Sequence, residues 1–420
     1  MVDFCSCANK NLPNLLPFHF SLLTLTFFRR GPRNAERGTR NFGSFFRVTR
    51  KKVSTPLTFS LFTLNSYFFS GGVFMNFRET APVLSALLRK GVSLGAYPCF
   101  AASAGAGEDV EYFEHYGHRS LYPKEKYLTE DTLFDMASLS KLMGTTMACL
   151  RMVEEGKINI EDNIGKYIEN CYGKDHITIF RLMTHTSGLP AHLPLYKEPD
   201  PTRVTEYILS PDLFYETGSK TVYSCMGYIL LGKILESIEK KPLDEIVKEK
   251  VFIPLEMNHS FYNPPKGIPC ASTEKDIFTG EIINGVVHDE NARFLGGVAG
   301  NAGMFCTLAD ATRFARMLSL RGKGYLSASL FEYAVTDHTP SLSESRGLGF
   351  QLYTGKPFPA GNKMHYGSYG HTGFTGTSIY VDNSTGVYGV LLTNRVHPTR
   401  ENNMLSIFRR DFYNTLFSEE

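Results

Sequence analysis

From residue 75 onward, the chain alternates apolar and polar residues in patterns that predict its first elements. Residues 76–91 carry apolar side chains at helical spacing, and Gly91 is expected to end this helix. Two segments with a period of two follow, at 97–105 and 111–118, and they predict a pair of strands. The body of the protein is therefore expected to begin with a helix and two paired strands.

A strongly apolar helix is the next predicted element. The short extended stretch 131–137 leads into it, the helix begins at Ser138, and Gly156 supplies the stop. Its apolar residues follow a period of 3.6, namely Leu139, Leu142, Met143, Met147, Leu150 and Val153. One side of this helix is therefore expected to be buried in the core.

Helical patterns dominate the middle of the chain, roughly 145–340, and strand patterns dominate its last part. The predicted helices are 178–185, 203–210, 226–241, 243–255 and 308–320, and the predicted late strands are 347–353, 366–373, 376–382 and 386–394. Strands thus flank a helical insert, and the two ends of the body are expected to share one sheet. The predicted fold class is α+β, an antiparallel sheet flanked by helices with a helical subdomain inserted.

Residues 1–74 differ in composition from the domain predicted for 75–420. They hold ten Lys and Arg against Asp3 and Glu36, whereas the body is mildly acidic. This basic segment has features of a targeting sequence, of a disordered extension and of an upstream-start artefact before Met75, and these alternatives stay open. Its apolar runs are shorter than a membrane span, and no run in 75–420 is long enough to predict a transmembrane helix.

The charge and the cysteines of the chain bear on its partners and on its cellular compartment. A mildly acidic body gives no reason to expect nucleic acid as a partner. The eight cysteines have neither the spacing of metal ligands nor the density of a small disulfide scaffold. Scattered cysteines favour a reducing compartment, so a cytoplasmic location is expected unless the N-terminal segment directs export or entry into an organelle.

Three S-x-x-K strings occur in the chain, and their surroundings differ. The string at Ser237 lies among charges at the polar end of a helix, and the one at Ser272 lacks a following apolar helix. Only Ser138 opens a buried helix, where free backbone N–H groups favour developing negative charge. Lys141 lies beside this hydroxyl, and desolvation is expected to lower the pKa of Lys141 toward that of a usable base. Taken alone, the string favours a simpler interpretation, an N-cap serine followed by a lysine that reaches solvent.

Two further stretches change that balance. Tyr223 stands in Y-S-C just before a second apolar helix, and the triplet His371, Thr372 and Gly373 ends a strand that turns back. Together with S-L-S-K at Ser138, they occur in the order S-x-x-K, Y-x-N and H-T-G. In these motifs the chain resembles the serine β-lactamase and penicillin-binding-protein superfamily, in particular its class C-like branch of esterases, D-aminopeptidases and low-molecular-weight penicillin-binding proteins. Connecting segments extend the resemblance over residues 76–415.

The resemblance implies a chemical role for each element. Ser138 is expected to attack an acyl carbonyl, and Lys141 to accept or share its proton. Tyr223, with its pKa lowered by Lys141, completes the base and protonates the leaving group. In relatives the oxyanion hole uses the N–H of the serine and of the residue after H-T-G, which are Ser138 and Phe374 here.

The third motif and one position of the second are expected to contact substrate. His371 faces the polar end of the substrate, and with Thr372 and Gly373 it forms a strand edge that approaches the substrate backbone closely. Cys225 stands where the family usually has Asn or Asp, and a thiol is a poor substitute for an amide. The basic residue of the third motif is a histidine instead of a lysine, which weakens the hold on a carboxylate. Both departures favour esters or small amides over β-lactams.

Other strings have structural interpretations. His185 and His192 in one loop, and residues 288–290 in another, lack the i,i+4 pairing of a zinc-binding helix, so neither metal nor cofactor is expected. The glycine-rich stretch 296–303 lacks the G-K-[ST] of a phosphate loop and is predicted to form tight turns. No G-x-S-x-G string occurs, which disfavours an α/β-hydrolase fold.

The sequence thus predicts a serine acyl hydrolase that acts through an acyl-enzyme on an ester or amide of a small-molecule or peptide-like substrate. Carboxylesterase or D-amino-acid peptidase chemistry ranks above β-lactamase activity, which stays an alternative. A second alternative is a non-catalytic binding or assembly module of the same fold, prompted by Cys225 and His371. The site is expected in the cleft between the sheet and the helical subdomain.

Overall fold

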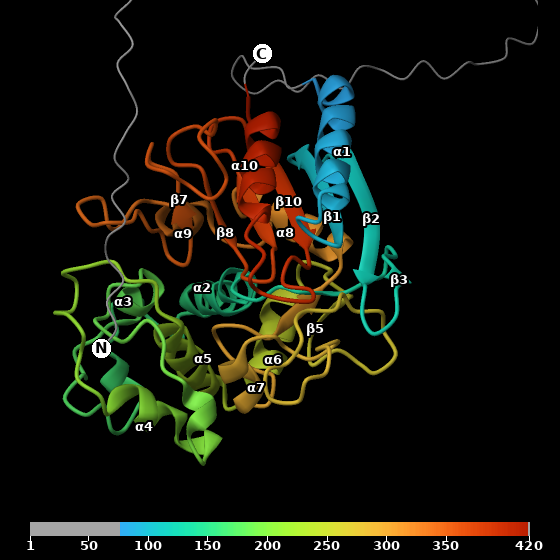
Figure 1. The fold of residues 1–420 in the computed structure, drawn as a ribbon. Helices are drawn as coiled ribbons and strands as arrows, with labels where there is room; N and C mark the ends of the chain where they lie inside the picture. Colours follow the sequence, from blue (N-terminus) through green and yellow to red (C-terminus); the bar gives the residue numbers. More distant parts are fainter. Residues whose placement is uncertain (1–75, 419–420) are drawn as a thin grey trace, which may run out of the picture. The chain divides into compact units, whose positions relative to one another are not determined.

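The structure, a computed structural model, describes residues 76–418, so the interpretations of segment 1–74 lie outside the described residues. Its centre is an antiparallel seven-stranded sheet with the strand order β3-β2-β1-β10-β9-β8-β7 (Figure 1). The strands are β1 (Cys99–Ala106), β2 (Tyr112–Ser120), β3 (Lys126–Tyr127), β7 (Gln351–Leu352), β8 (Tyr369–Thr372), β9 (Ser378–Val381) and β10 (Val387–Thr393). Because β1 pairs with β10 from Phe100 opposite Thr393 onward, the two ends of the body share one sheet, as predicted.

Helices cover both faces of this sheet (Figure 1). They are α1 (Phe77–Ser93) and α10 (Leu405–Leu416), which pack together on one face, and α8 (Leu308–Ser319) on the other. In β1, Phe100 and Ala102 belong to the core beneath α1 and α10, whereas Ala101 belongs to the core on the opposite face. Since both faces are covered, the central strands β1, β9 and β10 are buried along their whole length and mostly apolar, and the α+β class is confirmed.

The first helix does not end at Gly91, so that prediction is wrong. α1 continues to Ser93, and the chain turns at Gly95, which has a φ of 73°. A Cβ atom added at Gly91 would lie 2.1 Å from the hydroxyl oxygen of Tyr97. Glycine is therefore needed at this position because the Tyr97 ring packs directly against the helix.

The middle of the chain folds into short helices. They are α2 (Met147–Glu154), α3 (Ile179–Met183), α4 (Val204–Leu209), α5 (Cys225–Glu239), α6 (Leu243–Val247), α7 (Glu290–Phe294) and α9 (Ala328–Ala334), with a π-helical turn at Lys141–Thr146 directly before α2. Helix α5 is buried along most of its length, which explains why its sequence has hardly any polar face. That residues 145–340 form a separate subdomain stays a prediction.

A second, three-stranded sheet has the order β4-β6-β5. Its strands are β4 (Phe134–Asp135), β5 (Ser260–Tyr262) and β6 (Met304–Cys306). The extended stretch predicted at 131–137 contains β4, whereas β5 and β6 were not predicted because strands of three residues are too short to show alternation. This sheet fixes the segment just before Ser138, because Asp135 pairs with Phe305.

None of the helices described in residues 76–418 has both the length and the apolar character needed to cross a lipid bilayer.

Candidate active site

Ser138 lies in a strained turn between β4 and the helix that carries Lys141. The preceding residue, Ala137, has a φ of 47°, which is uncommon for a residue with a side chain. Its backbone N–H donates to Oδ1 of Asp135 at 2.8 Å, and the Asp135 side chain is buried. The buried carboxylate therefore stabilises a turn that leaves Ser138 half-buried at the cavity wall.

Lys141 is fully buried, and its ammonium has two hydrogen-bond partners. Nζ donates to Ser138 Oγ at 3.2 Å and to the carbonyl oxygen of Asn301 at 2.8 Å. Asn301 lies in the glycine-rich stretch 296–303, where Gly296, Gly297 and Gly303 have positive φ angles, as predicted for tight turns. No sequence pattern indicated that this stretch supplies a partner for Lys141.

Tyr223 lies just before α5, with its ring beside Lys141. The Lys141 Nζ atom is 5.0 Å from the centre of the Tyr223 ring, and the rings of His185 and His371 lie 4.6 Å and 5.8 Å from it. The buried phenol oxygen has no hydrogen-bond partner among the described residues, although Ser138 and Lys141 are close enough to lower its pKa. The structure thus brings Ser138, Lys141 and Tyr223 together at the wall of one cavity, with the phenol oxygen buried and unpartnered among the described residues.

The protonation of Lys141 and Tyr223 differs from the sequence-based expectation. Burial lowers the pKa of Lys141, but ionised Cys225 and Tyr223 raise it by more, so the pKa of Lys141 lies above its usual value. Burial raises the pKa of Tyr223, and the Lys141 ammonium offsets this only in part. Both expected shifts are therefore wrong in direction, because Lys141 is buried beside groups that become anions. Lys141 carries a positive charge that stabilises a Tyr223 phenolate.

Cys225, the first residue of α5, is half-buried next to this pair. Its backbone N–H donates to the carbonyl oxygen of Ala191 at 2.9 Å. Negative charge on its thiol raises the pKa of both Lys141 and Tyr223. The thiol thus occupies the position that the motif assigns to it, close to both ionisable groups.

His371 lies near the end of β8, and its imidazole is neutral. Burial, with help from the charges of Arg346 and Lys141, lowers the pKa of His371 to about 3. Nδ1 is 2.7 Å from the carbonyl oxygen of Thr372 and must carry the proton, since a carbonyl only accepts. Nε2 is then a lone-pair acceptor, and it has no partner among the described residues.

The turn after Thr372 packs directly against the residues before Ser138. A Cβ atom at Gly373 would lie 2.1 Å from Thr377 Oγ1 and 2.4 Å from the Met136 carbonyl oxygen, so only glycine fits. The Thr375 hydroxyl donates to the Asp135 carbonyl oxygen at 2.7 Å. These contacts hold Phe374 close to the Ser138 turn.

The backbone N–H groups of Ser138 and Phe374 donate to no group among residues 76–418. Two free N–H groups on adjoining turns are the arrangement that an oxyanion hole requires. Their placement is consistent with the role that the motif resemblance implies for Ser138 and Phe374.

Three arginines line the cavity next to Ser138, and the sequence did not predict them. The cavity has a volume of about 340 Å³ and is lined by Ser138, Tyr223, Arg346, Gln351, His371, Thr372, Gly373, Phe374, Arg395 and Arg409. Within the described part of the chain, its lining includes no Asp or Glu. Arg346 Nη1 and Arg409 Nε are buried without hydrogen-bond partners there. The cavity therefore carries excess positive charge.

The arginines are close enough to repel one another. Burial and the charges of Arg409 and Arg400 lower the pKa of Arg395. Holding like charges together in a partly buried site costs free energy unless an anion offsets it. The arrangement can therefore bind a negatively charged group beside Ser138.

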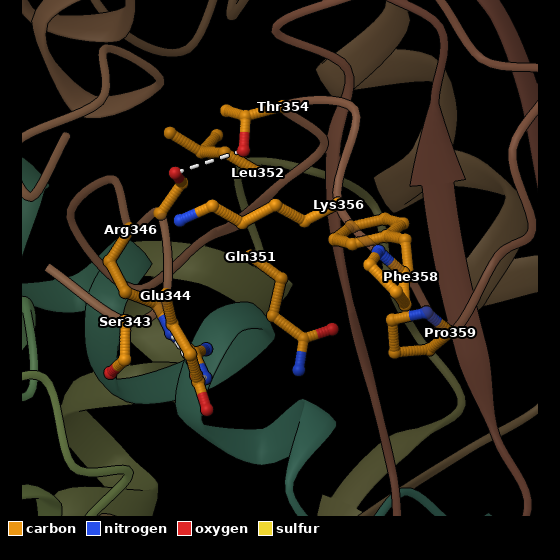
Figure 2. Close-up of a pocket in the computed structure, with 11 residues that line it drawn as sticks. Ser343, Glu344, Arg346, Gln351, Leu352, Thr354, Lys356, Phe358 and Pro359 are labelled. Carbon is orange, nitrogen blue, oxygen red and sulfur yellow. Dashed lines mark hydrogen bonds and ion pairs between the residues drawn. The ribbon is translucent and has the colours of Figure 1, made fainter. Parts of the chain in front are cut away.

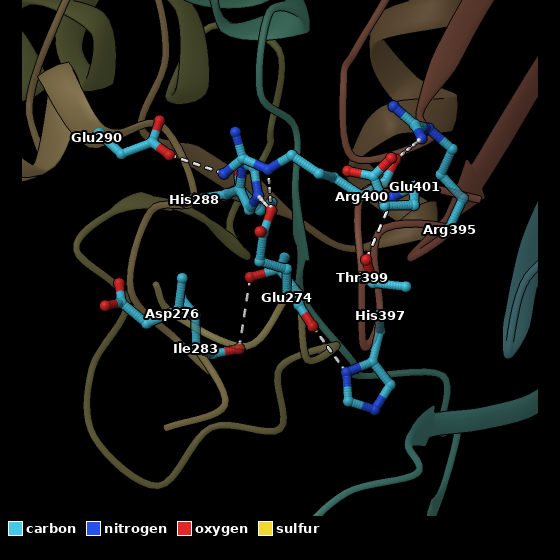
Figure 3. A network of polar contacts seen from close by, with 12 residues as sticks. Glu274, Asp276, Ile283, His288, Glu290, Arg395, His397, Thr399, Arg400 and Glu401 are labelled. Carbon is cyan, nitrogen blue, oxygen red and sulfur yellow. Dashed lines mark hydrogen bonds and ion pairs between the residues drawn. The ribbon is translucent and has the colours of Figure 1, made fainter. Parts of the chain in front are cut away.

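A polar network that includes Glu274, His288 and Arg400 lies next to Phe374, and Figure 3 shows these three residues. The His288 ring stacks on Phe374 with centres 5.6 Å apart, and the Arg395 guanidinium lies 4.7 Å from the Phe374 ring centre. Glu274 Oε2 accepts from His288 Nε2 at 2.6 Å and from Arg400 Nε at 2.5 Å. The exposed Phe374 ring is thus in contact with the His288 imidazole and the Arg395 guanidinium.

The candidate metal ligands serve structural roles. Besides the His288–Glu274 contact, Asp289 caps α7, and His185 accepts a hydrogen bond from the Ser224 N–H at 3.1 Å. Across residues 76–418, no group of three His, Cys, Asp or Glu side chains is arranged to hold a metal ion. His192 is exposed and does not line the Ser138 cavity.

Comparison with known proteins places the chain among enzymes. The family model described as Beta-lactamase matches residues 84–413. An N-acetylmuramyl-L-alanine amidase of Bacillus subtilis (strain 168) is 30% identical, over 68% of this chain and 73% of that protein. A putative D-alanyl-D-alanine carboxypeptidase of Escherichia coli (strain K12) is 33% identical, over 64% of this chain and 70% of that protein.

Two solved structures share the fold. EstCE1, a hydrolase with promiscuous acyltransferase activity, has a TM-score of 0.66 and 19% identity, covering 80% of this chain and 99% of its own. A class C beta-lactamase has a TM-score of 0.66 and 17% identity, covering 82% of this chain and 99% of its own. At these identities, the likeness concerns the fold.

Proposed function

This chain belongs to the beta-lactamase family of serine hydrolases, and we propose that it hydrolyses an amide or ester bond next to a free carboxylate. The observation that carries the proposal is the cavity beside Ser138, which three arginines and no acidic side chain line. A guanidinium binds a carboxylate through paired hydrogen bonds, and such charge-assisted bonds are the strong ones. The relative named as a putative D-alanyl-D-alanine carboxypeptidase supports a D-amino-acid peptide as the substrate.

The arginines change the expectation drawn from His371. A histidine in the third motif favoured substrates without a carboxylate, because a neutral imidazole holds an anion poorly. Arg395 and Arg409 supply the missing charge from other segments of the chain, and Arg346, whose charge Glu344 neutralises, adds the unpartnered Nη1 as a hydrogen-bond donor. The unpartnered Nε2 of His371 is then free to accept a hydrogen bond from an N–H of the substrate, which favours an amide.

The first chemical step forms the acyl-enzyme. Ser138 Oγ forms a bond to the acyl carbon and passes its proton to Tyr223 in its phenolate form, a minor form that the Lys141 ammonium stabilises against the raised pKa of this residue. The electron pair of the carbonyl π bond moves to oxygen, where the N–H groups of Ser138 and Phe374 bind it. When this intermediate collapses, the bond to the leaving group breaks and the leaving nitrogen or oxygen takes the proton from Tyr223.

The second step hydrolyses the acyl-enzyme. A water molecule gives its proton to the Tyr223 phenolate as its oxygen attacks the acyl carbon. The bond from that carbon to Ser138 Oγ then breaks, and the proton returns to the serine. The product is a carboxylic acid, and Ser138, Lys141 and Tyr223 regain their starting state.

The proposal is tested with N-acetyl-D-Ala-D-Ala and its C-terminal amide as paired substrates. We expect faster hydrolysis of the free acid, and an acyl adduct on the intact protein when p-nitrophenyl acetate is added, seen by mass spectrometry. Ser138→Ala should lose turnover and adduct, whereas Ser237→Ala, in a second S-x-x-K string, should keep both. Equal adduct on Ser138→Ala would exclude this nucleophile, and equal rates on acid and amide would exclude carboxylate recognition.

A further inference from the structure

A second cavity lies next to the one that holds Ser138 (Figure 2). It has a volume of about 280 Å³ and is lined by residues of the segments 343–346 and 351–359. Arg346 and Gln351 line both cavities, so the two meet at these side chains. Small-molecule sites have volumes of roughly 300–1,000 Å³, so the two cavities together suit one ligand with two parts.

Arg346 places the second cavity on the leaving-group side of the site. Its guanidinium lies 5.5 Å from the centre of the Tyr223 ring, and Tyr223 delivers the proton to the leaving group in the proposed mechanism. The leaving residue therefore lies beside Arg346. A side chain on that residue would extend past Arg346 and Gln351 into the second cavity.

The charge of the second cavity depends on Lys356. Arg346 and Glu344 line it too, but they neutralise each other, since Nε and Nη2 of Arg346 both donate to Glu344 Oε2. Lys356 Nζ donates only to the carbonyl oxygen of Leu342, at 3.3 Å, and no carboxylate of the described residues forms an ion pair with it. The cavity thus has one cation without a counter-charge.

The other walls suit a short aliphatic chain with a polar end. Figure 2 shows Phe358 and Pro359 on the wall opposite Glu344, with the Lys356 side chain reaching across toward Arg346. The Gln351 side-chain oxygen accepts from the Tyr380 hydroxyl at 2.5 Å, which leaves the amide N–H₂ of Gln351 as a donor. Apolar contact for methylene groups thus lies between an ammonium and an amide donor.

We propose that this second cavity selects substrates whose leaving residue has an acidic side chain, with Lys356 binding the side-chain carboxylate. This proposal rests on the proposed function, and it names the leaving residue as a dicarboxylic amino acid such as D-glutamate. Its α-carboxylate then lies at the arginines of the first cavity, and its side-chain carboxylate lies at Lys356.

The test compares three substrates that differ only in the leaving side chain: N-acetyl-D-Ala-D-Glu, N-acetyl-D-Ala-D-Gln and N-acetyl-D-Ala-D-Lys. Glutamate and glutamine are nearly isosteric, so their kcat/KM ratio reports the charge. Because Lys356 is exposed, we expect a ratio of about 3 to 5 in favour of D-Glu, falling as salt is added. Lys356→Gln should bring the ratio close to one.

The matched control is Lys363→Gln, because Lys363 is exposed in the same part of the chain and lines neither cavity. This variant should keep the wild-type ratio. Equal D-Glu to D-Gln ratios in the wild type and in Lys356→Gln would overturn the proposal. A preference for D-Lys would also overturn it, since Glu344 would then set the charge of the cavity.

A binding measurement separates this inference from the proposed function. Titration calorimetry with Ser138→Ala gives the Kd of each peptide in the absence of turnover. If the wild type cleaves none of the peptides, the proposed function fails, and the Kd values still decide between D-Glu and D-Gln. Tighter binding of D-Glu that is lost with the additional change Lys356→Gln supports the second cavity, and equal Kd values contradict it.

Discussion

The two halves of the Ser138 cavity are built in different ways. The reactive half consists of Ser138, Lys141 and Tyr223, and each lies at or just before the start of a helix. The recognition half consists of arginines from three separate places, namely Arg346 before β7, Arg395 after β10 and Arg409 on α10. In the reactive half, Lys141 donates to Ser138 and lies beside the Tyr223 ring, whereas the recognition half gathers charged side chains from distant segments.

This difference follows from what each half must do. Proton transfer and attack on a carbonyl require heavy atoms within hydrogen-bond reach and in fixed directions, so backbone geometry near the helix starts sets them. Attraction of a carboxylate falls off slowly with distance, so long side chains from unrelated segments serve equally well. Reaction chemistry is thus encoded in short motifs, and substrate charge is encoded in the tertiary fold.

The largest expected effect tests the reactive half. Tyr223→Phe removes the proton carrier and keeps the ring against His185 and His371, so kcat/KM for the dipeptide should fall roughly 10²- to 10⁴-fold. Thermal unfolding should change little, since the phenol oxygen has no hydrogen-bond partner among the described residues. Tyr207→Phe, at another buried and unpartnered phenol, is the control and should retain activity. If kcat/KM were unchanged in Tyr223→Phe, Tyr223 would carry no proton in the reaction and would only pack against its neighbours.

His371, where the two halves meet, gives the next largest effect. Its pKa is about 3 in the folded protein and about 6.5 when unfolded, so the unfolded state binds the proton first as pH falls. Neutral His371 makes its full contribution to the free energy of unfolding above pH ~6.5. This contribution is lost progressively as the pH falls toward ~3, and at pH ~5 about 2 kcal/mol of it is lost. Expressed as an unfolding equilibrium constant, that is about 30-fold.

Denaturant unfolding at two pH values measures this contribution. His371→Gln should show a smaller loss of unfolding free energy between neutral pH and pH ~5 than the wild type, by about 2 kcal/mol. His192→Gln, at an exposed histidine outside the cavity, is the control. If His371→Gln and the wild type lose the same free energy, the ring is not held neutral by burial.

The recognition half should respond to loss of a single arginine by a smaller factor. Arg409→Gln removes one of three guanidinium groups, and a charge-assisted hydrogen bond is worth about 1.5 kcal/mol or more, so KM for the free-acid dipeptide should rise about tenfold. The preference over the C-terminal amide should fall by a similar factor. Arg410→Gln, at the exposed neighbour on the same helix, should behave as the wild type. If Arg409→Gln and Arg410→Gln raised KM equally, the cause would be the loss of positive charge in general and not the loss of a contact in the cavity.

The fold could be predicted from the sequence where local patterns determine it. The strands at both chain ends alternate or are continuously apolar, so the shared sheet followed from them. Strands β5 and β6, of three residues each, could not be predicted because their pairing depends on contacts far along the chain. At Gly91, local rules indicated a helix end, but contact with the Tyr97 ring requires glycine there.

The candidate site divides in the same way. The reactive residues were found from motif spacing, and the structure places them side by side. The arginines were missed, although one signal was present: Leu405, Phe408, Phe412 and Leu416 have the helical spacing of α10, on which Arg409 lies. Their convergence on one cavity follows only from the pairing of β8, β9 and β10, and no local pattern encodes it.

The smallest expected effect concerns Cys225, where the reactive half departs from its motif. Asn at this position would supply an amide oxygen for Lys141 and an N–H₂ donor for substrate, which a thiol does not. One neutral hydrogen bond contributes about 0.5–1.5 kcal/mol, so Cys225→Asn should raise kcat/KM for the dipeptide about 2- to 10-fold. Cys225→Ser, with a hydroxyl too short for both contacts, should change kcat/KM less. A fall in kcat/KM with Asn would mean that the thiol itself is needed beside Lys141 and Tyr223, and the reactive half would then differ from its motif in chemistry as well as in sequence.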